Sequence, residues 1–319
     1  MKYHLLFVLF AMPVTFMSCM PQNSIGSGPV IQAGEIIQAI QNGKPVFIEN
    51  KTVEGDLDFS KLDGYTESSS MVRSYVAVSV TFISCHFKGK INAYQSNDQE
   101  TKVCSFEKNL AFSNCEMDKE VSFQESVISG KANFSSSVFK GKTSFEGTRF
   151  LGEAYFTKSK FEEEARFQNG FYSYKANWME AVFSKVVSFQ NSIFNYDAQW
   201  SVAKFLGYAD FSVCTFRGHV FFNYAKFKAQ AVLNTSIFYA RFEMMSTEFE
   251  KNLELKRCLF YGIPKFNKAQ MNEGLLLDNS TFLAGAPETS DWIKGSNFTL
   301  SLKESRYTTL NELKPLDIK

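Results

Sequence analysis

The side chains that can carry chemistry in this chain are six cysteines, three histidines and scattered carboxylates. A catalytic triad or a zinc centre needs several such groups in one place, and the chain has neither a CxxC pair nor clustered histidines. His86 and His219 occupy alternate positions that point away from the expected core, so we expect them to be solvated. Carboxylate runs such as Glu162, Glu163 and Glu164 are expected on a charged outer face. We therefore predict no catalytic residues, no metal site and no cofactor.

An 11-residue repeat must position all of these groups. A large apolar residue recurs from Phe123 to Phe282 at spacings that alternate between five and six, with a small residue two positions earlier. Two residues at this spacing lie on the same side of an extended segment, and a short segment must stack on its neighbours to bury them. Fixed-period self-similarity predicts a solenoid. The expected core includes Phe134, Phe139, Phe145, Phe150, Phe156, Trp178, Phe189, Trp200 and Phe211.

Two repeat units form one coil in our interpretation. The segments that contain Trp178 and Trp200 match at a 22-residue displacement, which predicts four short faces per coil and stacking of the two indoles. Such a tract of roughly seven coils would be about 35 Å long. Glycines such as Gly218 are expected at turns that need a positive φ. A right-handed coiled coil also has an 11-residue period, but the abundant Gly, Ser, Thr and aromatic residues disfavour it.

Five cysteines occupy the small inward position of the repeat, which otherwise holds Ala, Ser or Thr, and are expected to pack in the core: Cys85, Cys104, Cys115, Cys214 and Cys258. Cys214 and Cys258 lie two coils apart, about 9–10 Å, which exceeds the ~7 Å between Cα atoms that a disulfide allows. Cys104 and Cys115 are the one pair that we would test for a disulfide.

Runs such as Ala132-Asn133-Phe134, Ala209-Asp210-Phe211 and Ala225-Lys226-Phe227 resemble pentapeptide-repeat proteins, in the Phe-centred variant with alternating five- and six-residue steps. The resemblance covers about residues 46–283. It implies an all-β fold, a right-handed quadrilateral β-helix built from 22-residue coils. It implies little about function, because most members of the family are uncharacterised.

The N-terminus has the composition of a secretory signal. A short basic start, an apolar stretch too short to span a bilayer, and Ser18 predict a signal peptide over residues 1–18. Cys19 then resembles the acylated first residue of a bacterial lipoprotein, with an ordinary signal peptide and an incidental Cys19 as the alternative. Residues 19–32 are interpreted as a flexible, lipid-anchored tether. Met20, rather than Asp, at the next position resembles the pattern that sorts lipoproteins to the outer membrane, on its periplasmic or its surface face.

The remaining boundaries follow from the repeat. The β-solenoid with its N-terminal cap is assigned to residues 33–283, with a short capping helix at Gly34 to Asn42, and residues 284–319 are assigned to a C-terminal cap and tail. Residues 61–73 are expected to form a loop or an irregular coil. The register needs eight extra residues near 94–101, which we interpret as an outward loop. Trp292, Phe298 and Leu300 are expected to cover the last coil.

Charge separates the possible functions. Some cytoplasmic pentapeptide-repeat proteins resemble duplex DNA and inhibit topoisomerases, which requires a strongly negative rod. Here Lys and Arg number 34 against 33 for Asp and Glu, which opposes both DNA mimicry and nucleic-acid binding. The favoured interpretation is therefore a non-catalytic, membrane-anchored structural or interaction lipoprotein of the bacterial envelope, whose partner is an unknown envelope protein or glycan.

Exposed aromatic residues offer an alternative interpretation, a glycan- or protein-binding module. Phe171, Tyr174, Tyr196 and Tyr208 are candidates for an outward aromatic patch. A carbohydrate-active enzyme on the same scaffold is a more remote alternative.

Overall fold

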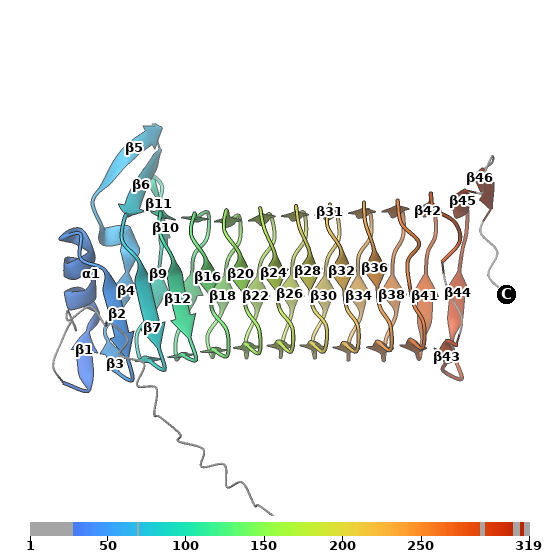
Figure 1. Ribbon diagram of the computed structural model, residues 1–319, viewed down its shortest axis with the longest axis horizontal. Helices are drawn as coiled ribbons and strands as arrows, with labels where there is room; N and C mark the ends of the chain where they lie inside the picture. Colours follow the sequence, from blue (N-terminus) through green and yellow to red (C-terminus); the bar gives the residue numbers. More distant parts are fainter. Residues whose placement is uncertain (1–27, 69, 288–290, 309–312, 316–319) are drawn as a thin grey trace, which may run out of the picture.

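The computed structural model describes residues 28–68, 70–287, 291–308 and 313–315. The predicted signal peptide, Cys19 and most of the predicted tether lie outside these residues. The chain forms a rod in which short strands stack along the long axis (Figure 1). The strands belong to four sheets, which the chain visits in the order B, A, C and D in each coil. The predicted all-β solenoid of 22-residue coils is confirmed, because Ala132 pairs in parallel with Ala154 and Ala154 with Ala176.

The strands are as follows. Sheet A contains β1 (Val30–Gln32), β3 (Thr52–Glu54), β8 (His86–Phe87), β13 (Glu116–Met117), β17 (Val138–Phe139), β21 (Lys160–Phe161), β25 (Val182–Phe183), β29 (Lys204–Phe205), β33 (Lys226–Phe227), β37 (Glu248–Phe249), β40 (Gln270–Met271) and β43 (Ile293–Lys294). Sheet B contains β2 (Val46–Glu49), β7 (Val80–Ile83), β12 (Leu110–Ser113), β16 (Ala132–Asn133), β20 (Ala154–Tyr155), β24 (Ala176–Asn177), β28 (Ala198–Gln199), β32 (Val220–Phe221) and β36 (Phe242–Glu243). Sheet C contains β4 (Leu57–Asp58), β9 (Ile91–Asn92), β14 (Val121–Ser122), β18 (Thr143–Ser144), β22 (Ala165–Arg166), β26 (Val187–Ser188), β30 (Ala209–Asp210), β34 (Ala231–Val232), β38 (Leu253–Glu254), β41 (Gly274–Leu276) and β44 (Thr299–Ser301). Sheet D contains β5 (Gly64–Ser68), β6 (Met71–Val76), β10 (Tyr94–Ser96), β11 (Thr101–Phe106), β15 (Val127–Ile128), β19 (Arg149–Phe150), β23 (Phe171–Tyr172), β27 (Ile193–Phe194), β31 (Thr215–Phe216), β35 (Ile237–Phe238), β39 (Leu259–Phe260), β42 (Thr281–Phe282), β45 (Arg306–Thr308) and β46 (Leu313–Pro315).

Aromatic rings fill the interior in columns that run along the axis. The rings of Trp178 and Trp200 stack with centroids 5.0 Å apart and planes 5° apart, as the 22-residue displacement predicts. Phe189 stacks between Phe167 and Phe211 at 4.9 and 4.8 Å. These spacings equal the distance between neighbouring strands, so each ring contacts the equivalent ring of the next coil. The other predicted core residues are also fully buried: Phe134, Phe139, Phe145, Phe150 and Phe156.

The small inward position also has a hydrogen-bonding role. The hydroxyls of Ser137, Thr148 and Ser192 donate to carbonyl oxygens of the preceding coil at 2.6, 2.7 and 3.0 Å. The thiols of Cys214 and Cys258 donate in the same way, each at 3.1 Å. Because an unpaired buried carbonyl is costly, Ser, Thr and Cys at this position satisfy a backbone group in addition to filling space.

The turns differ from the sequence-based expectation. Gly130 and Gly218 do not have a positive φ. They lie where a Cβ atom would come within 2.5 and 2.3 Å of carbonyl carbons of the preceding coil, so close approach of two backbones requires glycine there. The left-handed conformation instead recurs once in each 11-residue unit, at the corner between sheets B and A and at the corner between sheets C and D. Ser136, Lys158 and other mostly non-glycine residues adopt it there.

A helix covers the first coil. The helix α1 (Ala33–Gln41) lies across the N-terminal end of the rod and buries Ile36, Ile37 and Ile40 (Figure 1). It begins one residue before the predicted helix, and Gly43 ends it with a φ of 69°. The predicted tether over residues 19–32 needs a correction, because residues 30–32 form β1. This strand pairs with β3 and buries Ile31, so it extends the edge of sheet A.

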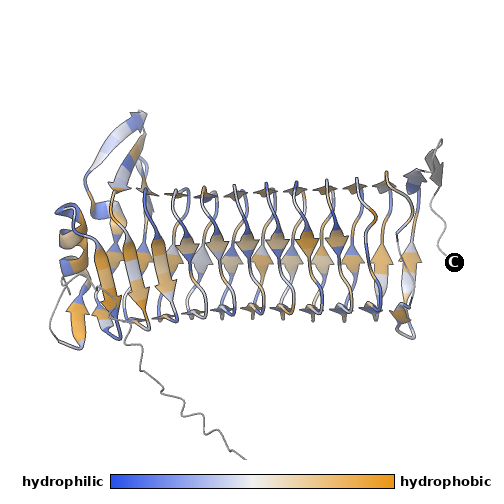
Figure 2. Cartoon of the chain, viewed as in Figure 1, coloured by the Kyte–Doolittle hydropathy of each residue, from blue (hydrophilic) through white to orange (hydrophobic). Residues whose placement is uncertain are grey.

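Two insertions project from the rod next to each other. The strand pairs Val46 with Val80 and His86 with Glu116 show that successive coils gain twelve and eight residues over the 22-residue period. The predicted loops at 61–73 and 94–101 are both β-hairpins, β5–β6 and β10–β11, preceded in the first case by the short 3₁₀ helix η1 (Phe59–Lys61). Strands β6 and β11 pair in parallel over their full length and join the hairpins into one sheet. We call the strands β5, β6, β11 and β10 the wing. Its tip is hydrophilic, whereas orange hydrophobic bands run along the rod (Figure 2).

The solenoid extends beyond the predicted boundary at residue 283. Strands β43, β44 and β45 add to sheets A, C and D in parallel, and β46 then pairs antiparallel with β45. Trp292, Phe298 and Leu300 pack against the end of the core. Sheet B stops earlier in the described residues, because Pro264 occupies its inward position and has no N–H to donate to the next coil.

Candidate functional site

The predicted aromatic patch divides between two corners of the rod. Tyr174 and Tyr196 both lie at the corner between sheets D and B, 52% and 57% exposed, and their rings stack at 5.6 Å. Phe171 is half-buried on the adjacent sheet D, beneath the guanidinium of Arg149 at 5.5 Å from the ring centroid. Tyr208 precedes β30 at the corner between sheets A and C, which is diagonally opposite in the order of the four sheets. Tyr208 therefore does not belong to the same surface.

The structure adds two tyrosines to the first corner. Tyr239 and Tyr261 are exposed between sheets D and B, and their rings stack at 4.8 Å. Arg217 lies between the two stacked pairs, at the same corner of the intervening coil, where its guanidinium donates to Asn195 at 2.9 Å. We call Tyr174, Tyr196, Tyr239 and Tyr261 the tyrosine edge. It spans five successive coils, a length of roughly 20 Å.

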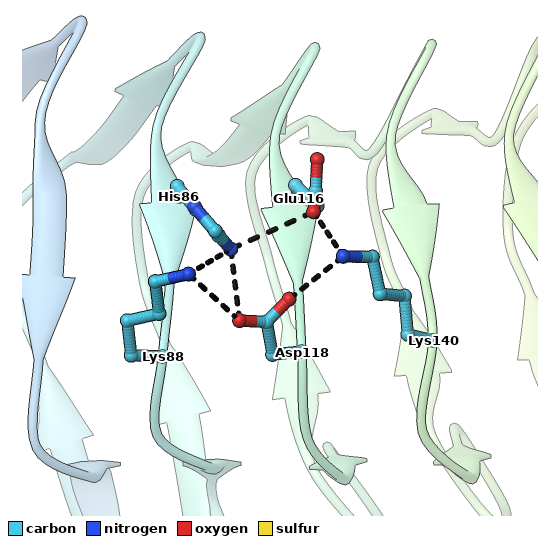
Figure 3. A network of polar contacts seen from close by, with 5 residues as sticks. All are labelled: His86, Lys88, Glu116, Asp118 and Lys140. Carbon is cyan, nitrogen blue, oxygen red and sulfur yellow. Dashed lines mark hydrogen bonds and ion pairs between the residues drawn. The ribbon is translucent and has the colours of Figure 1, made fainter.

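A network of charged side chains lies on the outer face of sheet A, across the rod from sheet D, to which the wing belongs (Figure 3). Nε2 of His86 lies 2.9 Å from a carboxylate oxygen of Asp118 and 3.6 Å from Glu116. Lys88 donates to Asp118 at 3.2 Å, and the Lys140 ammonium contacts both Asp118, at 2.9 Å, and Glu116. These five residues come from three successive coils, so the network ties the coils together.

The network shifts the ionisation of its members. Partial burial acts to raise the pKa of Asp118, but hydrogen bonds from His86, Lys140 and Lys88 outweigh it and hold that pKa well below its usual value. Hydrogen bonding to Lys140 likewise lowers the pKa of Glu116. The two carboxylates in turn raise the pKa of Lys140. Both carboxylates are therefore ionised at neutral pH.

His86, Glu116 and Asp118 also form a set of metal-ligand type, since their ligand atoms all lie within 4.8 Å of one another. Two ammonium groups already contact these carboxylates and supply the positive charge that a metal ion would bring. The arrangement is therefore better described as a salt-bridge network than as a metal centre. The expectation that His86 is simply solvated was wrong, because its ring is half-buried and bonded within the network.

The cysteines are buried free thiols at the positions that the repeat assigns to them: Cys85, Cys104, Cys115, Cys214 and Cys258. The pair that the structure brings together is Cys85 and Cys115, not Cys104 and Cys115. Cys104 lies on sheet D, whereas Cys85 and Cys115 precede neighbouring strands of sheet A. Hydrogen bonding to Cys85, together with burial, raises the pKa of Cys115, and burial raises the pKa of Cys104 to about 12.

The sequence contains a signal for the charged network and for the second tyrosine pair, although the sequence-based predictions include neither. The separation of His86 and Glu116 along the chain equals one coil plus the eight-residue insertion. Tyr239 and Tyr261 repeat at the 22-residue interval, one position earlier in the coil than Tyr174 and Tyr196. Counting along a single column therefore missed this half of the tyrosine edge.

Comparisons with known proteins agree with this architecture. Residues 123–170 match the family model described as pentapeptide repeats (9 copies). No curated protein matches the chain. Among the described residues, no helix has the length and hydropathy needed to span a bilayer. The solenoid and the family match together support a pentapeptide-repeat protein, whose fold is consistent with a structural or interaction module.

Proposed function

We propose that the protein is a non-catalytic interaction lipoprotein of the bacterial envelope, in which a rigid rod presents the tyrosine edge to a protein partner. The observation that carries the proposal is the alignment of four exposed tyrosines along one corner. Tyr and Arg are enriched among the residues that dominate binding energy at protein interfaces. Arg217 lies between the two tyrosine pairs. Stacking within each pair of rings restrains the tyrosine side chains, so less conformational freedom is lost on binding.

The proposal includes export through a signal peptide at residues 1–18 and attachment of the chain to the outer membrane through acylated Cys19. The sequence from Met1 to Met20 supports this part. The test is a Cys19→Ala variant, examined by fractionation and by incorporation of labelled palmitate. We expect the variant to lose the label and to appear in the soluble periplasmic fraction. Membrane retention of an unlabelled variant would contradict the anchor.

Site-specific photo-crosslinking in cells tests the tyrosine edge directly. A benzoylphenylalanine residue at position 196 replaces an exposed tyrosine of the edge, and the same residue at position 224 replaces Tyr224, which is 61% exposed at a different corner. We expect a discrete crosslinked protein from position 196 and none from position 224. Equal crosslinking from both positions, or a ladder of many products, would show that the edge selects no partner.

A second arm uses substitutions. Replacement of all four residues of the tyrosine edge by Ser is expected to remove the adduct that forms through a crosslinker at Arg217. A matched variant replaces four exposed apolar residues at other corners by Ser and is expected to retain it: Val186, Leu206, Val213 and Tyr224. An adduct that survives in the first variant, or disappears in both, would contradict the assignment of the edge.

A further inference from the structure

Sheet C carries a groove on the opposite side of the rod from sheet B. Its volume is about 400 Å³, within the range of about 300–1,000 Å³ of small-ligand sites. The groove lies over the coils next to the wing. Its lining includes Lys90, Tyr94, Ser122, Lys142, Ser144 and Arg166.

The repeat explains the shape of this groove. Ser122 and Ser144 are the outward residues of β14 and β18, and their short side chains form a low floor. Longer side chains occupy the equivalent positions at both ends, Asn92 on β9 and Arg166 on β22. Tyr94, at the start of the wing, stands beside the floor. The groove therefore lies where the regular coils meet the wing.

The charged groups of the groove are not all neutralised by one another. Lys90 pairs with Glu120 at 3.3 Å, and Nε of Arg166 donates to Glu164 at 2.7 Å. Between these pairs, the ammonium of Lys142 contacts no carboxylate within salt-bridge distance among the described residues. The groove thus has one net positive charge, carried by Lys142, which lines the same groove as the two serines.

The serines leave hydroxyl protons available. The oxygen of Ser144 accepts from the Glu146 N–H at 3.3 Å, so its own proton is free to donate elsewhere. The Ser122 hydroxyl makes no side-chain hydrogen bond within the part of the chain that the structure describes. An ammonium group and two hydroxyl donors that line one groove are suited to a carboxylate.

We propose that this groove binds an acidic saccharide, a sugar ring that bears a carboxylate. Lys142, Ser122 and Ser144 bind the carboxylate. The paired charges at each end and the amides of Asn92 and Gln124 offer both donors and acceptors, which ring hydroxyls need. Tyr94 packs against the apolar face of the sugar. The site lies on a different face from the tyrosine edge and does not depend on the proposed protein partner.

Digalacturonic acid is the probe, titrated into the full-length protein in detergent micelles and followed by calorimetry. Its dimethyl ester has the same rings without the charge. We expect saturable binding of the acid and at least about tenfold weaker binding of the ester, because the charged hydrogen bonds to the carboxylate are lost. N-acetylglutamate methylamide presents a carboxylate without a sugar, and it is expected to bind much more weakly than the acid.

Variants locate the binding. Lys142→Gln is expected to weaken binding about tenfold, and Ser144→Leu, which fills the floor, is expected to abolish it. The matched control is Ser188→Leu two coils further along sheet C, because Ser188 accepts the same 3.3 Å hydrogen bond from its own turn but does not line the groove. Circular dichroism melts establish that the leucine variants fold.

Several results would overturn the proposal. These are absence of saturable binding, equal affinity for the acid and its ester, and equal effects of Ser144→Leu and Ser188→Leu. Equal affinity for N-acetylglutamate methylamide would reduce the groove to a carboxylate site that does not recognise sugars. Lys142→Gln changes only an exposed side chain, so its outcome does not depend on whether the leucine variants fold.

Discussion

The regular coils and the wing are both built from β-strands, but they differ in how far the side chains of these strands are buried. From β14 to β40 each strand has two residues, and its inward residue is fully buried. In the wing, β5 has five residues and all of them are exposed. The coils are stabilised by contacts with the coils before and after them, whereas the wing depends mainly on pairing between its own strands. The same chain thus combines a cooperative core with a projection whose outer strand β5 contributes little to that core, although β6 and β11 bury Val76 and Phe106 in it.

Removal of a core ring should give the largest difference between the two regions. Phe189→Ala leaves a cavity between Phe167 and Phe211, and we expect a loss of ~3–5 kcal/mol in the free energy of unfolding. In the wing, Tyr65 is 53% exposed, and Tyr65→Ala should cost about 0.5 kcal/mol. Urea denaturation measures both, with the exposed Lys185→Ala as the neutral control. Equal midpoints for Phe189→Ala and Lys185→Ala would refute the inward and outward assignment.

Loss of a hydroxyl should separate the regions less strongly. Ser192 donates to the Phe167 carbonyl and accepts from the Gly170 N–H, both buried. Ser192→Ala leaves both backbone groups without this partner and should cost about 1–3 kcal/mol. Ser96 in the wing forms an exposed hydrogen bond with Thr101, and Ser96→Ala should cost at most about 0.5 kcal/mol. If Ser192→Ala costs as little as Ser96→Ala, the Ser192 hydroxyl fills space in the core but its hydrogen bonds add no stability.

One core substitution should increase stability. The hydroxyl of Tyr172 is buried and lacks a hydrogen-bond partner within the described structure. Its pKa is raised because burial disfavours the phenolate. Tyr172→Phe removes the unsatisfied group while it preserves the stacking on Phe194 at 4.5 Å, so we expect a gain of about 1 kcal/mol in thermal or urea unfolding. A destabilised variant would indicate that the hydroxyl is hydrogen-bonded in solution.

The smallest effect concerns pH and the network of Figure 3. The folded pKa of Asp118 is depressed, so its contribution to stability is present above the ordinary Asp value of about 4 and is lost as the pH falls from there toward the lower folded pKa. Asp118→Asn should reduce stability at pH 7 by about 0.5 kcal/mol. The variant should also lose less stability than the parent protein between about pH 4 and pH 2. Parallel stability curves for the two proteins over this window would exclude the network as the cause.

Much of the solenoid is predictable from sequence because one physical rule repeats. The spacing of Phe, Trp and small residues defines which side chains point inward, and the 22-residue displacement of Trp178 and Trp200 defines the coil. The helix over the first coil follows from Ile36, Ile37 and Ile40 on one face. These features depend on apolar burial, which a single sequence reports directly.

The remainder depends on relations between coils that the local sequence does not report. Non-glycine residues such as Lys158 adopt positive φ because the turn between two sheets imposes it, and Lys gives no local signal of this. The network of His86 and Asp118 forms across an insertion whose length must be known before the two coils can be aligned. The sequence-based prediction groups Tyr208 with Tyr174 and Tyr196 on one surface. The order of the four sheets places Tyr208 at the opposite corner of the coil.

Both insertions enter the solenoid at the same turn, between sheets C and D, and leave the parallel pairing of the neighbouring strands intact. The length of a coil is therefore free to vary at this turn without a change in the scaffold around it. A foreign peptide grafted in place of the exposed hairpin tip at residues 97–99 would be displayed at a defined height along the rod. Display of such grafts is a practical use of this tolerance for added length.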